Sequence, residues 1–419
     1  MQNGITSATT PTERWDDPLM AILRPAIRAA IEDALGQELA TWLGAARYER
    51  VAARVGYRHG VQHRTLGTPV GQIALTVPRA RVQAAHGQMR EWRSTQLPRF
   101  HRRMQQVDQA MVQVYLSGTN QRKVAAALRP LLTGVALSKS AVSRLAGELQ
   151  VAREAWMTRS LAEDAFVYLY LDGFVVPVRR DGRVQRTPLL VVVGVRATGE
   201  RVLLALQLAT GETTLGWRAV LEQLATRGLP TPQLCIIDGS PGLRAALTTV
   251  WPTVAIQRCV VHKLRNLLAH APPHSHAAVT ADFHKVVYAT SAAEAQQAYA
   301  RTHRQWHLRC AAVAQSLAEG GPELLTFYRF PAAQWKSLRS TNVIERIHEE
   351  LRRRIKTQAA WSTETGVLNL LHGLFATGII RLRRIDGFTT LTVSSPCRSA
   401  RLARARGSRS PFPIPSSPP

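Results

Sequence analysis

The segment from Ala165 to Arg180, AFVYLYLDGFVVPVRR, constrains the fold more than any other, because a nearly unbroken apolar run carries a single carboxylate, Asp172. The run predicts a buried β-strand. An ionised Asp inside such a strand must be paired, hydrogen-bonded or bound to a metal ion, since a charge isolated from water is costly. The fold must therefore supply a partner for Asp172.

A second segment repeats this arrangement. QLCIIDGSPGLRAAL contains a short buried strand, an Asp-Gly pair at Asp238 and then a helical pattern, so that two strands each deliver a carboxylate at their end. Either Asp alone is more often a turn former before glycine. The rest of the chain has to decide between two turns and one functional site.

The charge balance indicates the kind of partner. The 419 residues include 54 Lys and Arg against 28 Asp and Glu, which gives a formal net charge of +26. This excess predicts a polyanionic partner, and nucleic acid fits best. Neither a secretory signal nor an apolar run of about 20 residues is present, and the cysteines show no disulfide-framework spacing. We therefore expect a cytoplasmic protein without a membrane partner; its cysteines are Cys235, Cys259, Cys310 and Cys397.

The first hundred residues predict a basic helical and hairpin region. Apolar residues at helical spacing predict a helix before Ala53, and alternating residues around two glycines predict a hairpin between Gly56 and Pro78. Seven arginines follow between Arg79 and Arg103. They form either a solvated face or a phosphate-contacting surface.

Between Gln105 and Gln150 the pattern is helix, turn, helix, turn, helix. Gly118 is placed to close the first helix, Asn120 to cap the second and Ser138 to cap the third. This pattern is typical of a helix-turn-helix unit, whose last helix enters the major groove, but an ordinary three-helix packing unit fits it equally well. The residues of the last helix that would contact DNA are Lys139, Ser140, Ser143 and Arg144.

The central region predicts an α/β layer with a mixed sheet. After the Asp172 strand come two further strand-like runs, TPLLVVVGVRA and RVLLALQLATG, then a helix from Thr214 to Arg227 and the Asp238 strand. In this order the first and fourth strands can lie side by side in parallel. Asp172 and Asp238 would then meet, and two adjacent carboxylates repel each other unless a divalent cation lies between them.

The region after Val254 predicts helices. Cys259 and His262 have half of a zinc-site spacing, but no second pair follows, so we do not expect zinc. A long helical stretch runs to about Phe330, and AQWKSLRSTNVIERIHEELRRRIKTQ then predicts one basic helix. Its apolar stripe is Val343, Ile347, Leu351 and Ile355, and Glu345 falls on the opposite face with His348 and Arg352 near it.

Glu345 has two interpretations. Asn342 followed three residues later by Glu345 has the form of a capping box that only closes the helix. Alternatively, Glu345 is a third carboxylate of a metal site, surrounded by arginines that hold nucleic-acid phosphates. Glu349 and Glu350 are the rival acids, and Glu349 has a structural partner in Arg353 one turn on.

Four motifs together resemble the Mutator-type transposases of bacterial insertion sequences: LDG at Asp172, DGSPGLRAAL at Asp238, RCVVHKLRNLL from Arg258 and WKSLRSTNVIERIHEELRRRIK from Trp335. The resemblance runs from about Tyr57 to Phe388. It implies a ribonuclease-H-like α/β core, a mixed sheet flanked by helices, with an all-helical insertion between the second Asp and the Glu. It also implies that Asp172, Asp238 and Glu345 are the catalytic, metal-binding triad, with Cys259 and His262 as a Cys-x-x-His element of uncertain role.

The resemblance also implies the chemistry. We expect a DNA transposase of the bacterial, nucleoid-associated cytoplasm that uses two Mg²⁺ ions, or Mn²⁺ in their place, for phosphodiester hydrolysis and transesterification. Its partners would be double-stranded element ends and target DNA, and it would act as a homodimer or higher oligomer. Further DNA contacts would come from Arg258, His262, Lys336, Arg346, Arg352 and Arg353. The alternative is a catalytically inactive, transposase-derived DNA-binding protein or repressor.

The expected domains follow from these boundaries. They are a basic helical and hairpin region (1–104), a helix-turn-helix unit (105–160), the first part of the core (161–258), the helical insertion (259–335), the last core helices (336–388) and a basic Pro/Ser-rich tail (389–419). The tail has no acidic residue and cannot build a core, so we expect it to be disordered.

Overall fold

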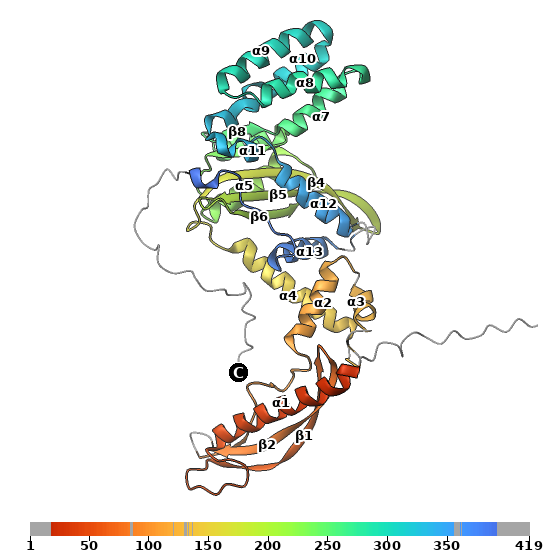
Figure 1. Cartoon of the computed structure of the whole chain (residues 1–419), viewed down its shortest axis with the longest axis vertical. Coiled ribbons are helices and arrows are strands. Elements are labelled where there is room, and N and C mark those ends of the chain that lie inside the picture. Colours follow the sequence, from red (N-terminus) through yellow and green to blue (C-terminus); the bar gives the residue numbers. More distant parts are fainter. Residues whose placement is uncertain are drawn as a thin grey trace, which may run out of the picture. The chain divides into compact units, whose positions relative to one another are not determined.

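The computed structural model describes residues 18–83, 87–119, 121–129, 132, 134–135, 137–355, 361 and 363–391, and it forms two compact units, Met1–Glu148 and Leu149–Pro419 (Figure 1). The predicted tail lies outside the described residues from position 392 onward. No helix in the described ranges is long and apolar enough to cross a membrane.

The first unit begins with a helix on a three-stranded sheet. Helix α1 (Pro18–Leu43) packs on strands β1 (Gly56–Thr68), β2 (Gly71–Gln83) and β3 (Met89–Glu91), which pair antiparallel in that order. Leu35 lies in one apolar cluster with residues of β1 and β2, and Leu39 and Leu43 lie in a second with Trp92. The predicted helix and hairpin are confirmed, and the hairpin extends five residues beyond the predicted Pro78.

Three helices follow in the predicted order: α2 (Gln105–Leu116), α3 (Gln121–Leu128) and α4 (Lys139–Thr158). Gly118 follows α2 with φ of +102°, a backbone conformation that favours glycine. The Ser138 hydroxyl accepts a 3.2 Å hydrogen bond from the Ala141 amide in the first turn of α4. Both predicted end signals are confirmed, whereas Asn120 lies outside the described residues.

The second unit is built on a mixed five-stranded sheet. Its strands are β4 (Phe166–Arg180), β5 (Arg183–Arg196), β6 (Arg201–Leu208), β7 (Leu234–Ile237) and β8 (Ala255–Arg258), in the order β6-β5-β4-β7-β8. Strands β4, β5 and β6 are antiparallel, whereas β7 is parallel to β4 and β8 is parallel to β7. The expected parallel pairing of the two Asp-bearing strands is confirmed, and β8 is a strand that the sequence did not predict.

Helices cover both faces of this sheet. On one face, α5 (Thr214–Thr226) and α6 (Pro241–Val250) bury Trp217 and Leu243 against Leu169 and Leu171 of β4. The other face carries α11 (Trp335–Leu338), α12 (Asn342–Ile355) and α13 (Glu364–Ala376). Tyr170 belongs to this second face, because its hydroxyl donates to the Ser337 carbonyl at 2.9 Å. Side chains alternate along a strand, so Asp172 points to the same face.

Between β8 and α11 the chain is helical throughout. The elements are α7 (Val260–His270), η2 (Pro273–Ser275), α8 (His276–Val287), α9 (Ala292–Arg309), α10 (Ala311–Gly320), η3 (Gly321–Arg329) and η4 (Ala332–Gln334). They enclose an apolar core of their own, with Phe283, Trp306 and Leu317 fully buried, and extend away from the sheet (Figure 1). A last short helix, η6, covers Phe388–Thr390.

The expected single basic helix is wrong, because the chain breaks between α11 and α12. At the break, the Arg339 carbonyl accepts a 2.9 Å hydrogen bond from the Val260 amide, and the Thr341 amide donates to the Cys259 sulfur at 3.3 Å. These two bonds use backbone groups that a continuous helix would have paired internally. The break therefore fixes the start of α12 to the start of α7.

Candidate active site

Asp172 and Asp238 occupy neighbouring positions on two parallel strands. Leu171 of β4 pairs with Ile237 of β7, and each Asp is the next residue of its chain. Only Asp238 stands at a strand end; the expectation that Asp172 does so is wrong, since β4 continues to Arg180. Asp172 is 3% exposed, so its carboxylate depends on protein neighbours rather than water.

Each Asp also makes the local bond that its Asp-Gly pair predicts. Asp172 Oδ1 accepts from the Gly173 amide, and Asp238 Oδ1 accepts from the Ser240 amide, both at 2.9 Å. Gly239 has φ of +104°, which makes the Asp238 turn a position for glycine. Turn formation and a functional role are therefore compatible for Asp238.

The two carboxylates interact unfavourably. Burial, and next the negative charge of Asp238, raise the pKa of Asp172 to about 7 from its ordinary 3.8. Closely spaced carboxylate oxygens are the donor set that Mg²⁺ and Mn²⁺ prefer, and a cation between them would remove the repulsion. The pair fits a divalent metal ion, although no three His, Cys, Asp or Glu side chains of the described ranges are arranged around one metal position.

Glu345 lies in the first turn of α12 and is already engaged. Its Oε1 accepts from Arg265 Nη1 of α7 at 2.6 Å and lies 3.7 Å from His262 Nε2. The helix begins at Asn342, and the amide of Glu345 bonds to the Thr341 carbonyl. The Glu345 carboxylate therefore faces α7 rather than serving as the partner of an Asn342 cap.

Cys259 and His262 join the start of α7 to the start of α12. Cys259 is fully buried, and Thr341 Oγ1 lies 3.4 Å from His262 Nδ1. The hydrogen bond with Cys259 raises the pKa of His262 to about 9; burial opposes this, and the charges of Asp172 and Asp238 support it. A protonated His262 thus stands among the acids of the proposed triad.

Sequence reasoning missed a fourth acid, Glu212, in the loop between β6 and α5. A Cβ atom on Gly173 would lie 2.6 Å from Glu212 Oε1, so only glycine leaves room for this side chain beside Asp172. Burial and the charge of Asp238 raise the pKa of Glu212. The only sequence feature that points to Glu212 is Gly173 of the LDG motif. A glycine there indicates a close neighbour, but the sequence does not identify that neighbour as Glu212.

A family model described as "Transposase, Mutator family" matches residues 8–378. The chain belongs to this family. It is 33% identical to the transposase for insertion sequence element IS406 of Burkholderia multivorans over 84% of this chain and 89% of that protein. It is 34% identical to the transposase for insertion sequence element ISRM5 of Rhizobium meliloti, over 84% and 86%.

Among solved structures, the Drosophila P element transposase strand transfer complex covers 68% of this Mutator-family chain and 82% of that chain. The sequence identity is 10% and the TM-score 0.28. This likeness is too low to assign a fold.

Four of the basic residues predicted to contact DNA are exposed in this Mutator-family chain: Lys336, Arg346, Arg352 and Arg353. Lys336 lies 3.9 Å from Asp386, and Arg353 pairs with Glu350 at 3.0 Å, where the sequence suggested Glu349. Ser140, Ser143 and Arg144 are also exposed on α4, opposite the buried Ala141, Val142 and Leu145. The side chain of Lys139 is outside the described part of the chain.

Two residues have surroundings other than those predicted. Arg258 is only 5% exposed and binds both carboxylate oxygens of Glu319, so it is not available as a surface contact for DNA. His348, expected beside Glu345 on the outer face, is buried with its ring centroid 4.1 Å from that of Phe174. Burial lowers the pKa of His348 to about 3, so this residue is neutral.

Proposed function

We propose that this chain is a DNA transposase that binds the terminal inverted repeats of its insertion sequence. It would catalyse metal-dependent DNA cleavage and strand transfer by in-line phosphoryl transfer on a ribonuclease-H-like core. The observation that carries the proposal is the pair Asp172 and Asp238 on adjacent parallel strands, in a chain of the Mutator family. In-line transfer needs positioned metal ligands rather than a covalent enzyme intermediate.

The three proposed acids would act together as metal ligands. Asp172 and Asp238 would hold Mg²⁺ or Mn²⁺, with Glu345 as the third ligand. Metal ions held by these residues, two in number if the expectation is right, would supply the positive charge that activates the attacking oxygen and stabilises the leaving one. Glu345 must first leave Arg265, whose side chain is exposed and able to turn to a DNA phosphate. His262, which faces the same acids, would lie beside the strand that is cut.

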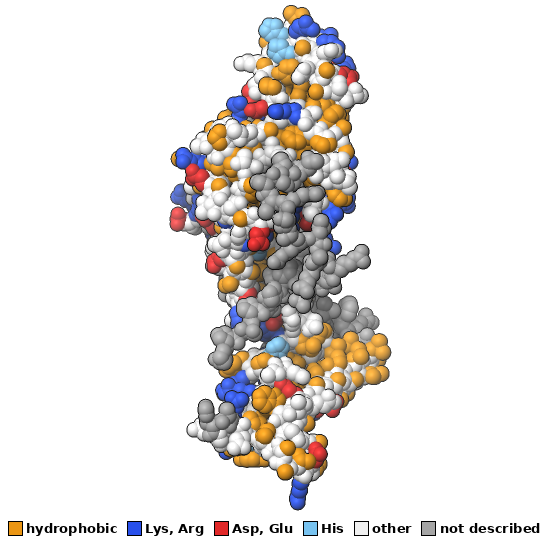
Figure 2. All heavy atoms as spheres, turned by 90° about the vertical axis from the view of Figure 1, so that its left-hand side faces the viewer, with side chains coloured by type: hydrophobic (Ala, Val, Ile, Leu, Met, Phe, Trp, Pro, Cys, Tyr) orange, Lys and Arg blue, Asp and Glu red, His pale blue; other side chains and the backbone are white. Residues whose placement is uncertain are grey.

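The surface charge supports a DNA partner. On the second unit, Lys336 of α11 is exposed, and Arg346, Arg352 and Arg353 are exposed on α12, the helix that carries Glu345. On the helical insertion, α9 exposes Arg301, Arg304 and Arg309, and Figure 2 shows His and basic side chains together at the end of the insertion. Joining two DNA ends would require at least two copies of the chain.

One observation favours the alternative, a transposase-derived DNA-binding protein without catalysis. The Glu345 carboxylate is held by Arg265 at 2.6 Å, so a three-acid metal site is not assembled in the described residues. If that contact persists on DNA, the chain would bind element ends without cutting them.

The deciding experiment is cleavage and strand transfer on labelled DNA that carries the element's own ends, with Mg²⁺. We expect the intact protein to cut, and Asp238→Asn and Glu345→Gln to abolish cutting while end binding persists. Binding without cutting by the intact protein, in Mg²⁺ and in Mn²⁺, would establish the alternative.

A further inference from the structure

Arg258 is the last residue of β8, and its side chain packs against the turn that carries Asp238. Arg258 pairs with Ile237 in the parallel register of β7 and β8, and the next amide, that of Cys259, donates to the Ile237 carbonyl at 2.7 Å. A Cβ atom on Gly239 would lie 2.3 Å from both Nε and Nη2 of Arg258. The guanidinium group therefore lies directly on the Asp238–Gly239 turn, in the space that any other residue at position 239 would occupy.

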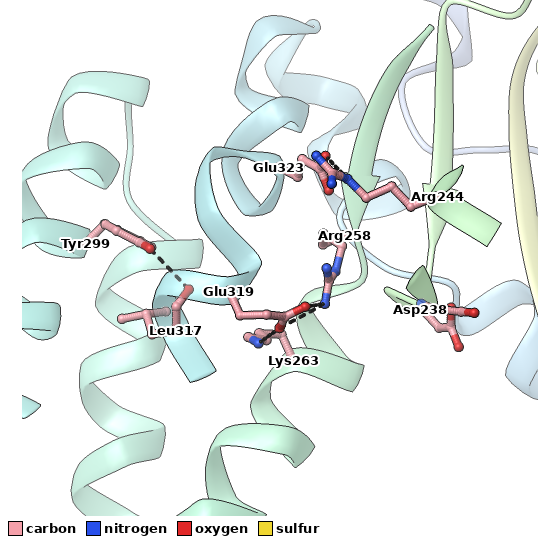
Figure 3. A network of polar contacts seen from close by, with 9 residues as sticks. Asp238, Arg244, Arg258, Lys263, Tyr299, Leu317, Glu319 and Glu323 are labelled. Atoms are coloured by element: carbon pink, nitrogen blue, oxygen red, sulfur yellow. Dashed lines mark hydrogen bonds and ion pairs between the residues drawn. The ribbon is translucent and has the colours of Figure 1, made fainter. Parts of the chain in front are cut away.

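The position of this guanidinium group is set by the helical insertion. Its Nη2 donates to Oε1 and Oε2 of Glu319 in α10, at 2.9 and 3.2 Å, and Lys263 Nζ of α7 donates to Oε2 at 2.5 Å (Figure 3). The Arg258 and Lys263 side chains are 6% and 1% exposed. Two buried cations thus depend on a single carboxylate, and a buried cation without its partner is strongly unfavourable.

A second set of bonds fixes the insertion to the same strand. Gln257, fully buried, donates from Nε2 to the Leu324 carbonyl of η3 at 3.0 Å, and its Oε1 accepts from the Phe327 amide at 2.8 Å. Strand β8 therefore has little freedom relative to the insertion. Of the groups that β8 presents to the Asp238 turn, the Arg258 guanidinium is the one whose placement depends on an ion pair.

We propose that Glu319 of the helical insertion positions the Asp238 carboxylate through Arg258. The inference rests on the proposed function, in which Asp238 binds the catalytic metal ion. Glu319 and Arg258 are positioning residues that do not touch the DNA or the metal ion themselves. The insertion is thereby a part of the catalytic centre and more than a surface for DNA.

The physical reason is geometric. Gly239 has positive φ and no side chain, so the Arg258 guanidinium packs directly on its backbone, beside the hydrogen bond that Asp238 Oδ1 accepts from the Ser240 amide. Without Glu319, Arg258 would leave its buried place for water and the turn would gain freedom. A displacement of about 1 Å in a catalytic group can lower the rate by roughly 100-fold.

The test compares Glu319→Ala with a matched control, Glu323→Ala. Glu323 of η3 pairs with Arg244 of α6 at 2.7 Å, so it also joins the insertion to the segment after Asp238, but it makes no contact with the turn (Figure 3). Three quantities are measured on the full chain with element-end DNA: DNA affinity, the single-turnover cleavage rate at saturating DNA, and the Mg²⁺ concentration for half-maximal rate. Thermal unfolding is followed in parallel.

We expect Glu319→Ala to cleave roughly 100-fold more slowly and to need about tenfold more Mg²⁺, with DNA affinity retained. Glu323→Ala should behave like the unmodified chain. Arg258→Lys is the second variant, in case Glu319→Ala does not fold. The lysine keeps the positive charge but lacks the planar guanidinium group that binds Glu319 and covers Gly239. This variant should therefore also need a higher Mg²⁺ concentration for half-maximal cleavage rate.

Three outcomes would overturn the inference. If Glu319→Ala or Arg258→Lys has the rate and Mg²⁺ requirement of Glu323→Ala, the positioning role fails while the transposase function stands. If Glu319→Ala unfolds at a lower temperature and cleaves more slowly but needs no more Mg²⁺, the contacts among Glu319, Arg258 and Lys263 only stabilise the fold. If the unmodified chain does not cleave, the proposed function fails and the inference fails with it.

Discussion

Asp172 is the residue at which the proposed metal site would lower the stability of the metal-free fold. Its pKa rises to about 7 because it is buried next to Asp238. In the unfolded chain the group ionises near pH 4, so unfolding releases a proton between these two values. The folded state therefore loses stability as the pH rises from about 4 to about 7, and the loss is complete above pH 7.

The expected result is that Asp172→Asn stabilises the chain in metal-free buffer at pH 8. The gain in the free energy of unfolding should be a few kcal/mol, with ~4 kcal/mol as the upper limit for a shift of about three pKa units. It should be much smaller near pH 4, where Asp172 of the folded chain is protonated and therefore carries no charge, as in the Asn variant. Denaturant unfolding at the two pH values measures it, and an equal effect at both would contradict the raised pKa that burial and the charge of Asp238 give to Asp172.

Gly173 gives a second residue-scale prediction. Gly173→Ala places a methyl group 2.6 Å from Glu212 Oε1, so the Glu212 side chain must move away from Asp172. Because that side chain is flexible and its loop exposed, the cost in stability should be about 1 kcal/mol or less. Cleavage should fall to the level of Glu212→Ala, and the double variant should be no worse than either single one. Additive losses would show that Gly173 matters for another reason.

At the scale of elements, the strand order was predictable and the junctions were not. Long apolar runs identified β4, β5 and β6, and their order placed the two Asp-bearing strands side by side. Strand β8 has only four residues, AIQR, and a segment of this length is too short to show the alternation of apolar and polar residues that predicts a strand. The break before α12 is set by Cys259 and Val260, some 80 residues earlier in the chain, so no local signal encodes it.

The contact between Cys259 and the start of α12 leads to a prediction about stability. Cys259→Ala removes the acceptor of the buried Thr341 amide, whereas Cys235→Ala removes the same atom from the buried strand β7 without this role. The free energy of unfolding should fall by about 1 kcal/mol more for Cys259→Ala. Equal losses from the two variants would mean that the Cys259–Thr341 bond does not hold the start of α12.

At the scale of the whole molecule, the proposal of a DNA partner rests on composition and family rather than on individual contacts. The net charge of +26 and the family assignment both favour DNA, yet Arg258, chosen for its place in a motif, proved to be buried. Burial depends on tertiary neighbours that a single sequence does not specify. Two of the three proposed acids could be paired from strand order, while Glu345 depended on the family resemblance and Glu212 was missed.

The charge excess makes a prediction for the first unit. Arg144→Gln on α4 should weaken binding of element-end DNA and lower the slope of log affinity against log salt by about one if Arg144 contacts a phosphate. Arg218→Gln is the matched control, because Arg218 is exposed on α5 and paired with Glu222. A titration over several salt concentrations measures both, and identical slopes would remove Arg144 from the DNA interface.

The proposed catalysis depends on Asp238 as a metal ligand, and a change of ligand chemistry at this position tests that role most directly. Asp238→Cys replaces a carboxylate with a thiolate, which binds Mn²⁺ better than it binds Mg²⁺. We predict that this variant cuts element-end DNA in Mn²⁺ and not in Mg²⁺, while Asp238→Ser cuts in neither. Cleavage by Asp238→Ser in Mg²⁺ at the rate of the unmodified chain would contradict it.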